Sequence, residues 1–309
     1  MIKRTLLSAA LLVGSASAGE KRIALSFDDA PMGGGPIYSG SDRTPALIDA
    51  LAEAETGPVA MFITTRGFNA RADGRARVEA YDNAGHLIAN HSHTHPWSSQ
   101  TEEDAFLADL DQASALIADF ENLRPWYRFP FLDEGGRGRN VGKRDAYRAA
   151  LNARGLSNGY VTVDTYDWHL VSVWNKAVRD GKDVNLDAVR DVYVAMVVDA
   201  AEHYAAMAEE TLGRQPAHVL LLHENDAAAA FIGDAVSALR AAGWEIISPD
   251  EAYADPIAEQ EPQTTFSGMG RIAALAYDGG ARGEAFYEHW SASEEGIEER
   301  LQAAGAFAD

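Results

Sequence analysis

Hydrophobic and polar positions along the chain follow two alternating periods. Short apolar runs of strand length alternate with segments whose apolar residues recur at helical spacing. The runs that predict strands are residues 22–27, 59–63, 86–90, 126–129, 159–163, 218–222 and 244–247. The segments that predict helices are residues 44–54, 75–83, 102–121, 143–153, 186–212 and 227–241. This alternation predicts an α/β fold with a mainly parallel sheet, in which the loops after the strands carry the chemistry.

The first eighteen residues depart from this pattern. Lys3 and Arg4 precede a short apolar stretch that ends in Ala16-Ser17-Ala18. A basic start, an apolar middle and a small-residue cleavage site are typical of a secretory signal peptide. The apolar stretch is shorter than the about 20 residues that span a bilayer. We therefore expect an exported protein, either periplasmic or extracellular, without a membrane span.

The composition changes again after Asp255-Pro256, where the chain becomes polar and then rich in glycine. A helix is predicted over residues 284–304. Its apolar face favours packing on the main domain over disorder, and consists of Phe286, Tyr287, Trp290, Ile297 and Leu301. The predicted organisation is a signal peptide over residues 1–18, a main domain over 19–255 and a C-terminal extension over 256–309.

Charge and cysteine content narrow the possible partners. The chain has 26 Lys and Arg against 47 Asp and Glu, a formal net charge of −21. Such an acidic chain argues against nucleic acid and against anionic lipid as partners. There is no cysteine, so a metal site would have to use His, Asp and Glu side chains.

The first predicted strand ends in two adjacent carboxylates, Asp28 and Asp29, followed by Ala30 and Pro31. Neighbouring carboxylates repel each other and need a cation, an arginine or a shared proton to coexist in a partly buried place. The strand end therefore predicts a functional site. The glycine-rich residues 32–40 lack the Lys-Ser/Thr of a phosphate-binding loop, and we expect a mobile loop at the rim of that site.

Three histidines fall within five residues, at His91, His93 and His95, and Pro96 follows them. A tight turn could bring the first and last of them onto one ion. Imidazoles suit zinc and similar metals, and an Asp oxygen can complete three protein ligands. The alternative is a surface histidine cluster. Together with the paired carboxylates the cluster favours a metal site, with His93 directed elsewhere.

Three further segments near predicted strand ends contain residues that could take part in the chemistry. Arg128 could hold a carboxylate by a bidentate bond, or form an ordinary surface ion pair. Asp164, Asp167 and Trp168 suggest a rim with an aromatic wall, or simply a turn. His223 ends an apolar strand and could donate a proton near neutral pH, or could be a capping or core histidine.

Taken in order, these segments resemble the five motifs of the polysaccharide deacetylases, the NodB-homology family or carbohydrate esterase family 4. The motifs are SFDDAP at 26–31, HSHTHP at 91–96, RFPF at 128–131, DTYDW at 164–168 and LLH at 221–223. The resemblance covers about residues 22–253. It implies a distorted (β/α) barrel, here with a C-terminal helical extension. It also implies hydrolysis of N-acetyl groups on N-acetylglucosamine-containing polysaccharide or oligosaccharide.

The resemblance also implies one divalent metal, usually zinc, with cobalt or nickel as alternatives. Its ligands would be Asp29, His91 and His95. The neighbouring Asp28 would act as the general base, and Arg128 would orient it.

The remaining roles implied by the resemblance concern the leaving group and the acetyl group. His223 would be the general acid, with Asp167 tuning it. The backbone N–H of Phe131 would help to hold the oxyanion. Leu221 and Trp168 would line the pocket for the acetyl methyl group.

Three features depart from the family pattern. Ala30 stands where glycine is usual, and Phe131 where tyrosine is usual. The segment 169–217 and the C-terminal extension are additional. They leave the polymer open among peptidoglycan, chitin-like oligomers and exopolysaccharide. The alternatives are a related metal-dependent amidohydrolase acting on a non-sugar amide, and a catalytically idle cell-wall-binding relative.

Overall fold

The computed structural model describes residues 19–265, 268–283, 286 and 288–308. The predicted signal peptide, residues 1–18, lies outside the described residues. No described helix is both long enough and apolar enough to cross a membrane.

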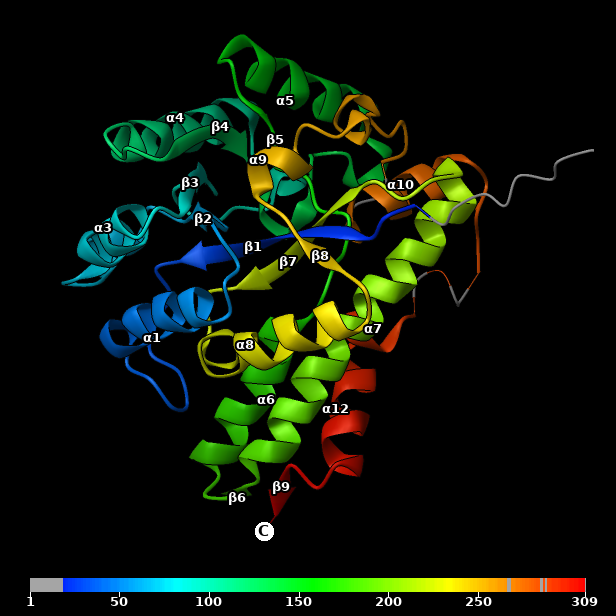
Figure 1. The fold of residues 1–309 in the computed structure, drawn as a ribbon. Helices are drawn as coiled ribbons and strands as arrows, with labels where there is room; N and C mark the ends of the chain where they lie inside the picture. The colour runs from blue at the N-terminus through cyan, green and yellow to red at the C-terminus, as the bar shows by residue number, and fades with distance from the viewer. Residues whose placement is uncertain (1–18, 266–267, 284–285, 287, 309) are drawn as a thin grey trace, which may run out of the picture.

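A parallel sheet of seven strands forms the centre of the molecule (Figure 1). Its order is β5-β4-β3-β2-β1-β7, and β8 pairs with the start of β1. The strands are β1 (Arg22–Ala30), β2 (Ala60–Ile63), β3 (Leu87–Asn90), β4 (Leu123–Tyr127), β5 (Ser157–Asn158), β7 (Ala217–His223) and β8 (Glu245–Ile246). Every pair within this sheet is parallel, which confirms the predicted α/β class.

Helices surround the sheet on both sides (Figure 1). They are α1 (Gly40–Glu53), α2 (Gly67–Ala70), α3 (Gly74–Asn83), α4 (Glu103–Ile117), α5 (Val141–Ala153), α6 (Asp167–Arg179), α7 (Leu186–Leu212), α8 (Asp226–Ala241), α9 (Pro249–Ala252), α10 (Gly270–Asp278) and α12 (Glu294–Ala303). The longest helix, α7, has the bounds that its apolar periodicity predicts, because Asn185 caps its start and Gly213 ends it in the left-handed conformation.

The sheet curves into a distorted barrel that the segment after β5 closes. Gly159 N–H donates to the carbonyl of Tyr127 on β4 at 2.8 Å. Four residues later, Val163 N–H donates to Val219 on β7 at 3.0 Å, and Leu221 N–H donates back to Val163 at 2.9 Å. One short segment therefore connects the two edges of the sheet.

The predicted strand over residues 159–163 is wrong in this form. The two-residue β5 ends before this segment, at Asn158, and within the segment Val163 forms an isolated bridge to Leu220, because the chain crosses here between two strands instead of running along one. Gly159 makes that crossing possible, since a Cβ there would lie 2.6 Å from the ring of Phe62.

The C-terminal extension packs against the helices on one side of the sheet. Helix α10 contacts α7, and α12 contacts both α6 and α7. The last described residues form β9 (Phe307–Ala308), which pairs antiparallel with β6 (Asp183–Val184).

The helix predicted over residues 284–304 is shorter in the structure. A 3-10 turn covers Trp290–Ala292, and α12 begins only at Glu294 because the Ser293 side chain caps it by accepting from Gly296 N–H. Residues 284–285 and 287 lie outside the described residues. Helix α10 was not predicted, because glycines on both sides of it interrupt the apolar pattern.

The glycine-rich residues 32–40, expected to be a mobile loop, are held by two buried carboxylates. Met32 N–H donates to Glu224 at 2.6 Å. The N–H groups of Ile37 and Tyr38 donate to Asp226 at 2.6 and 2.9 Å. The loop is therefore tied to the end of β7 at three backbone positions.

Two arginines balance the charge of these carboxylates. Arg43 bonds Asp226 at 2.9 Å, and Arg77 bonds Glu224 at 2.7 Å. The Tyr81 hydroxyl also donates to Glu224, at 3.0 Å. All of these groups are buried, so each charge depends on its partner for compensation.

Replacing Glu224 by Gln tests this network. The substitution leaves Arg77 buried without a carboxylate. We therefore expect the free energy of unfolding, measured by urea denaturation, to fall by about 3–5 kcal/mol. The control is Glu251→Gln, which breaks an exposed pair with Arg22 and should cost less than about 1 kcal/mol. Equal losses in the two variants would contradict the proposed role of the buried network.

Candidate functional site

A pocket of about 560 Å³ opens at the carboxyl ends of the central strands, within the range of ligand-binding pockets. Eight of the ten predicted site residues line it: Asp28, Asp29, His91, His95, Phe131, Trp168, Leu221 and His223. The other two, Arg128 and Asp167, lie behind its wall, each bonded to a residue that lines it. The structure therefore brings all ten residues into one site.

Asp29, His91 and His95 form a cluster suited to a divalent metal. Asp29 Oδ1 lies 3.4 Å from His95 Nε2 and 3.7 Å from His91 Nε2. The three potential ligand atoms lie within 4.8 Å of one another. His91 Nδ1 hydrogen-bonds the carbonyl of Arg128 at 2.9 Å, which leaves Nε2 free to face the cluster. Two imidazoles and one carboxylate fit zinc, with room for further ligands.

The protonation states suit metal binding. Burial would raise the pKa of Asp29, but His95 and His91 beside it hold that pKa below its usual value. Burial lowers the pKa of His95 to about 4. A neutral imidazole and an ionised carboxylate are the forms that bind a metal.

An irregularity at the end of β1 brings two adjacent carboxylates into one pocket. Neighbouring residues of a regular strand point to opposite faces of the sheet. Here the register of β1 against β2 shifts between Phe27 and Ala30, and Asp29 has a φ of 67°. Such a bulge redirects a side chain. Thr64 Oγ1 then donates to Asp29 at 3.1 Å and holds it in place.

A tight turn brings the two ligand histidines together. Ser92 and His95 have φ values of 72° and 59°, and His95 N–H donates to Ser92 Oγ at 2.9 Å. His93 lies elsewhere, with Nδ1 2.9 Å from Thr65 Oγ1. The turn therefore separates the middle histidine from its two neighbours.

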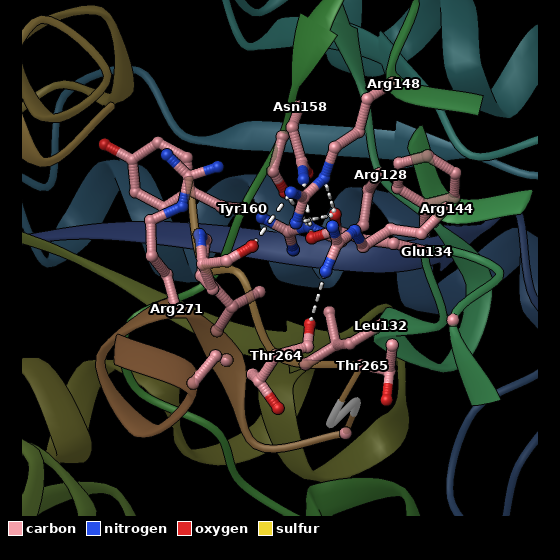
Figure 2. A pocket seen from close by; sticks show the side chains of 18 residues that line it. Arg128, Leu132, Glu134, Arg144, Arg148, Asn158, Tyr160, Thr264, Thr265 and Arg271 are labelled. Carbon is pink, nitrogen blue, oxygen red and sulfur yellow. Dashed lines mark hydrogen bonds and ion pairs between the residues drawn. The ribbon is translucent and has the colours of Figure 1, made fainter. Parts of the chain in front are cut away.

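Arg128 fixes the other carboxylate of the pair. Its Nη1 donates to Asp28 Oδ1 at 2.6 Å, and both side chains are buried. The guanidinium is held by Gly159 O at 2.7 Å and Tyr253 OH at 2.9 Å. The guanidinium also stacks on Phe62, with its central carbon 3.8 Å from the centre of the ring. In Figure 2, Arg128 lies among the side chains of a second cavity behind the site.

Asp167 holds His223 in one orientation. Asp167 Oδ1 lies 2.6 Å from His223 Nδ1, while Oδ2 accepts from the backbone N–H of His223 at 2.9 Å and from Asn225 Nδ2 at 2.8 Å. Burial acts to lower the pKa of His223, but the Asp167 carboxylate outweighs it and raises that pKa to about 9. The register of β1 against β7 places Asp28 directly beside His223.

The sequence predicts Asp167 in a rim or a turn, and the structure corrects this prediction. Asp167 is the first residue of α6. Sequence analysis missed this helix because its β-branched and aromatic residues resemble a strand. The buried residues Leu170, Val171, Trp174 and Ala177 nevertheless recur at helical spacing and could have indicated it. The helix N-terminus is a favourable place for the carboxylate of Asp167.

Aromatic residues form part of the pocket lining. Phe131 stacks on Trp97 with ring centroids 3.8 Å apart and an interplanar angle of 2°, and Arg137 lies 4.3 Å from the centre of the Trp97 ring. The rings of Tyr166 and Trp168 are neighbours, with centroids 5.3 Å apart. Trp97 and Tyr166 were not predicted as site residues, although each lies within two residues of one that was.

The sequence indicates Asp164 only as part of a rim, yet this residue lines the pocket and is 2% exposed. Burial raises the pKa of this carboxyl to about 8, against the opposing charge of His223. The site therefore contains a carboxylic acid that is mainly neutral at pH 7. Gly268 and Met269, from the C-terminal extension, also line the pocket and were not predicted.

The polysaccharide deacetylase family model matches residues 15–150. No curated protein matches the chain. Similar solved structures include a family 4 carbohydrate esterase from Streptomyces lividans in complex with acetate, which is 22% identical, with 76% of this chain and 97% of that chain covered and a TM-score of 0.46.

Two further structures are similar to the chain. The catalytic domain of a peptidoglycan N-acetylglucosamine deacetylase from Eubacterium rectale is 19% identical, with 77% and 92% covered and a TM-score of 0.49. A CE4 family pseudoenzyme from Bacillus anthracis is 16% identical, with 73% and 63% covered and a TM-score of 0.47.

The family match includes the first three motifs that carry the resemblance. The other two motifs, at 164–168 and 221–223, lie outside the matched range, but the structure places them in the same pocket. The resemblance that the motifs predicted is confirmed: residues 15–150 match the family model of the polysaccharide deacetylases.

Proposed function

We propose that the protein is an exported, metal-dependent hydrolase that removes N-acetyl groups from N-acetylglucosamine-containing polysaccharide or oligosaccharide and releases acetate. One observation carries the proposal. Two adjacent carboxylates are held apart, Asp28 by Arg128 and Asp29 by two histidines, in a pocket that also contains the His223–Asp167 pair.

The residues of the cluster would hold one divalent cation, zinc by preference and cobalt or nickel otherwise, through Asp29, His91 and His95. Such an ion polarises an amide carbonyl and lowers the pKa of a bound water. The donor atoms converge already, so the chain would bind the ion with little rearrangement.

Asp28 is suited to the role of general base because it is not needed as a ligand. Arg128 holds its Oδ1, while Oδ2 lies 3.6 Å from His91 Nε2 beside the cluster. From that position Oδ2 would accept a proton from the attacking water. The ion pair keeps Asp28 fixed during the transfer.

His223 is suited to the role of general acid. An amine is a poor leaving group unless it is protonated, so the reaction needs a proton donor. Asp167 holds Nδ1 of His223 and keeps the ring charged at neutral pH, which leaves Nε2 to deliver the proton. Asp28 and His223 lie beside each other on neighbouring strands, within reach of one substrate.

The pocket walls suit a glycan. Leu221 and Trp168 would accept the acetyl methyl group, and the backbone N–H of Phe131 would donate to the oxyanion. The stacked pair of Trp97 and Phe131 offers an aromatic surface for the apolar face of a sugar. This surface favours a glycan over a non-sugar amide.

An exported enzyme of this kind would act on a polymer outside the cytoplasm. The predicted signal peptide would export the chain. Peptidoglycan, chitin-like oligomers and exopolysaccharide all carry the acetamido group that this site would hydrolyse. An idle binding relative would not need Asp28, Arg128 and His223 together, and all three are present in one site.

Acetate release tests the proposal. We expect the zinc-loaded protein to release acetate from N-acetylglucosamine oligomers, and chelation of the metal to stop the release. Asp28→Asn should lower kcat by about 100- to 10,000-fold because the proton acceptor is lost. The control Asp250→Asn, which breaks an exposed pair with Arg124, should retain wild-type turnover. An Asp28→Asn variant with full turnover would contradict the mechanism.

The protonation of His223 gives a second test, on the metal-free protein. Because its folded pKa is raised, the His223–Asp167 pair stabilises the fold fully below pH about 6.5, and the contribution is lost as pH rises through about 9. Asp167→Asn should lower the pKa of His223 clearly below about 9, since burial opposes the charged ring and only the charges of Asp29 and Asp28 still favour it. A histidine NMR titration measures both proteins. An unchanged pKa in the variant would contradict the assignment.

A further inference from the structure

The C-terminal extension contributes a segment, here called the strap, that consists of residues 262–271 and is described at 262–265 and 268–271. Two arginines on α5 hold its first half. Arg148 Nη1 donates to Pro262 O at 2.9 Å, and Arg144 Nη1 donates to Thr264 O at 3.0 Å. Figure 2 shows both arginines at the second cavity, with the bond from Arg144 to Thr264. The strap is therefore fixed to the barrel by charged donors.

The second half of the strap is docked just as closely. Arg271 N–H donates to Val161 O at 2.7 Å, and its guanidinium stacks on the Tyr160 ring at 3.9 Å. Gly270 has a φ of 81°, and a Cβ there would lie 2.8 Å from Val161 O. Only glycine permits this approach to the segment that closes the barrel.

Between these two anchors, the described strap residues lie close to the candidate active site. Thr265 lies against Gly136 in the loop after β4, next to the pocket residue Arg137. Gly268 lines both the pocket and the second cavity behind it. The described strap residues thus lie beside the loop after β4 at Thr265, at both cavities at Gly268, and beside Val161 at Gly270.

Met269 is the strap side chain at the pocket. It is 8% exposed, packs with the main hydrophobic core, and lines the same pocket as Leu221 and Trp168. Methionine is unbranched and apolar, so it fills irregular space beside other apolar groups. Its place is set by Arg271 and Gly270, the next two residues, which are both fixed to Val161.

We propose that Met269 is a specificity-determining residue that limits the length of the N-acyl group the pocket accepts. The inference rests on the proposed deacylase function. It assigns a part of the substrate pocket to the C-terminal extension, which lies outside the family-matched residues 15–150. One methylene more or less in an apolar pocket changes selectivity by about 10- to 200-fold, so a single side chain can set this limit.

The test uses one glucosamine oligomer carrying N-acetyl, N-propionyl or N-butyryl groups. The measured quantity is kcat/KM for release of the corresponding carboxylic acid. In Met269→Ala the butyryl-to-acetyl ratio should rise by about 10-fold or more, because space opens beside the acyl group. Met269→Leu conserves most of the volume and should keep the wild-type ratio. An unchanged ratio in Met269→Ala would overturn the proposal.

A matched control separates pocket size from general loosening of the core. Met207 on α7 has the same 8% exposure but does not line the pocket. Met207→Ala should leave the ratio unchanged, and an equal rise there would overturn the proposal. Partial unfolding lowers the rates on all three substrates together and does not alter their ratio. If Met269→Ala does not fold, Met269→Val takes its place and should show a smaller rise in the butyryl-to-acetyl ratio. A Met269→Val variant with the wild-type ratio would overturn the proposal.

The two proposals fail in distinguishable ways. A wild-type protein that releases no acid from any of the three oligomers would overturn the deacylase function and, with it, the role of Met269. An active wild-type protein whose selectivity does not respond to Met269→Ala would overturn only the role of Met269.

Discussion

The buried ion pair between Arg128 and Asp28 is the interaction on which the site depends. Two adjacent carboxylates at the end of one strand repel each other, and the 2.6 Å bond from Arg128 compensates one of them. The arginine itself depends on Gly159, on Tyr253 and on the ring of Phe62. These contacts come from separate parts of the barrel, so its closure by the segment after β5 is also what fixes the guanidinium. Loss of that closure would free both the arginine and the carboxylate.

A second constraint is backbone geometry that a regular strand would not adopt. Asp29, Ser92 and His95 have positive φ values, which cost about 1–3 kcal/mol each and persist only where the surroundings enforce them. This geometry turns Asp29 toward the histidines while Asp28 stays beside His223 in the register of β7. The strain therefore has a clear purpose, which is to give two neighbouring side chains different partners.

The sequence predicts the long periodic elements well, and it identifies residues that the structure brings together in one pocket, because strand ends and motifs are local features. It predicts α7 to the residue, since a cap and a glycine mark its ends. It fails where tertiary contacts decide. The segment 159–163 crosses between strands, α6 has the residue types of a strand, and the loop at 32–40 is held by Glu224 and Asp226 far along the chain. Asp164 and Met269 join the site only through folding.

In the proposed mechanism Asp28 and Asp29 have different tasks, one as a free base and one as a metal ligand. The most direct measurement is the zinc content, per mole of folded protein, of the Asp28→Asn and Asp29→Asn variants after equilibration with one equivalent of metal and gel filtration. We expect nearly full zinc in Asp28→Asn and a large loss in Asp29→Asn. Equal zinc content in the two variants would contradict this division of tasks.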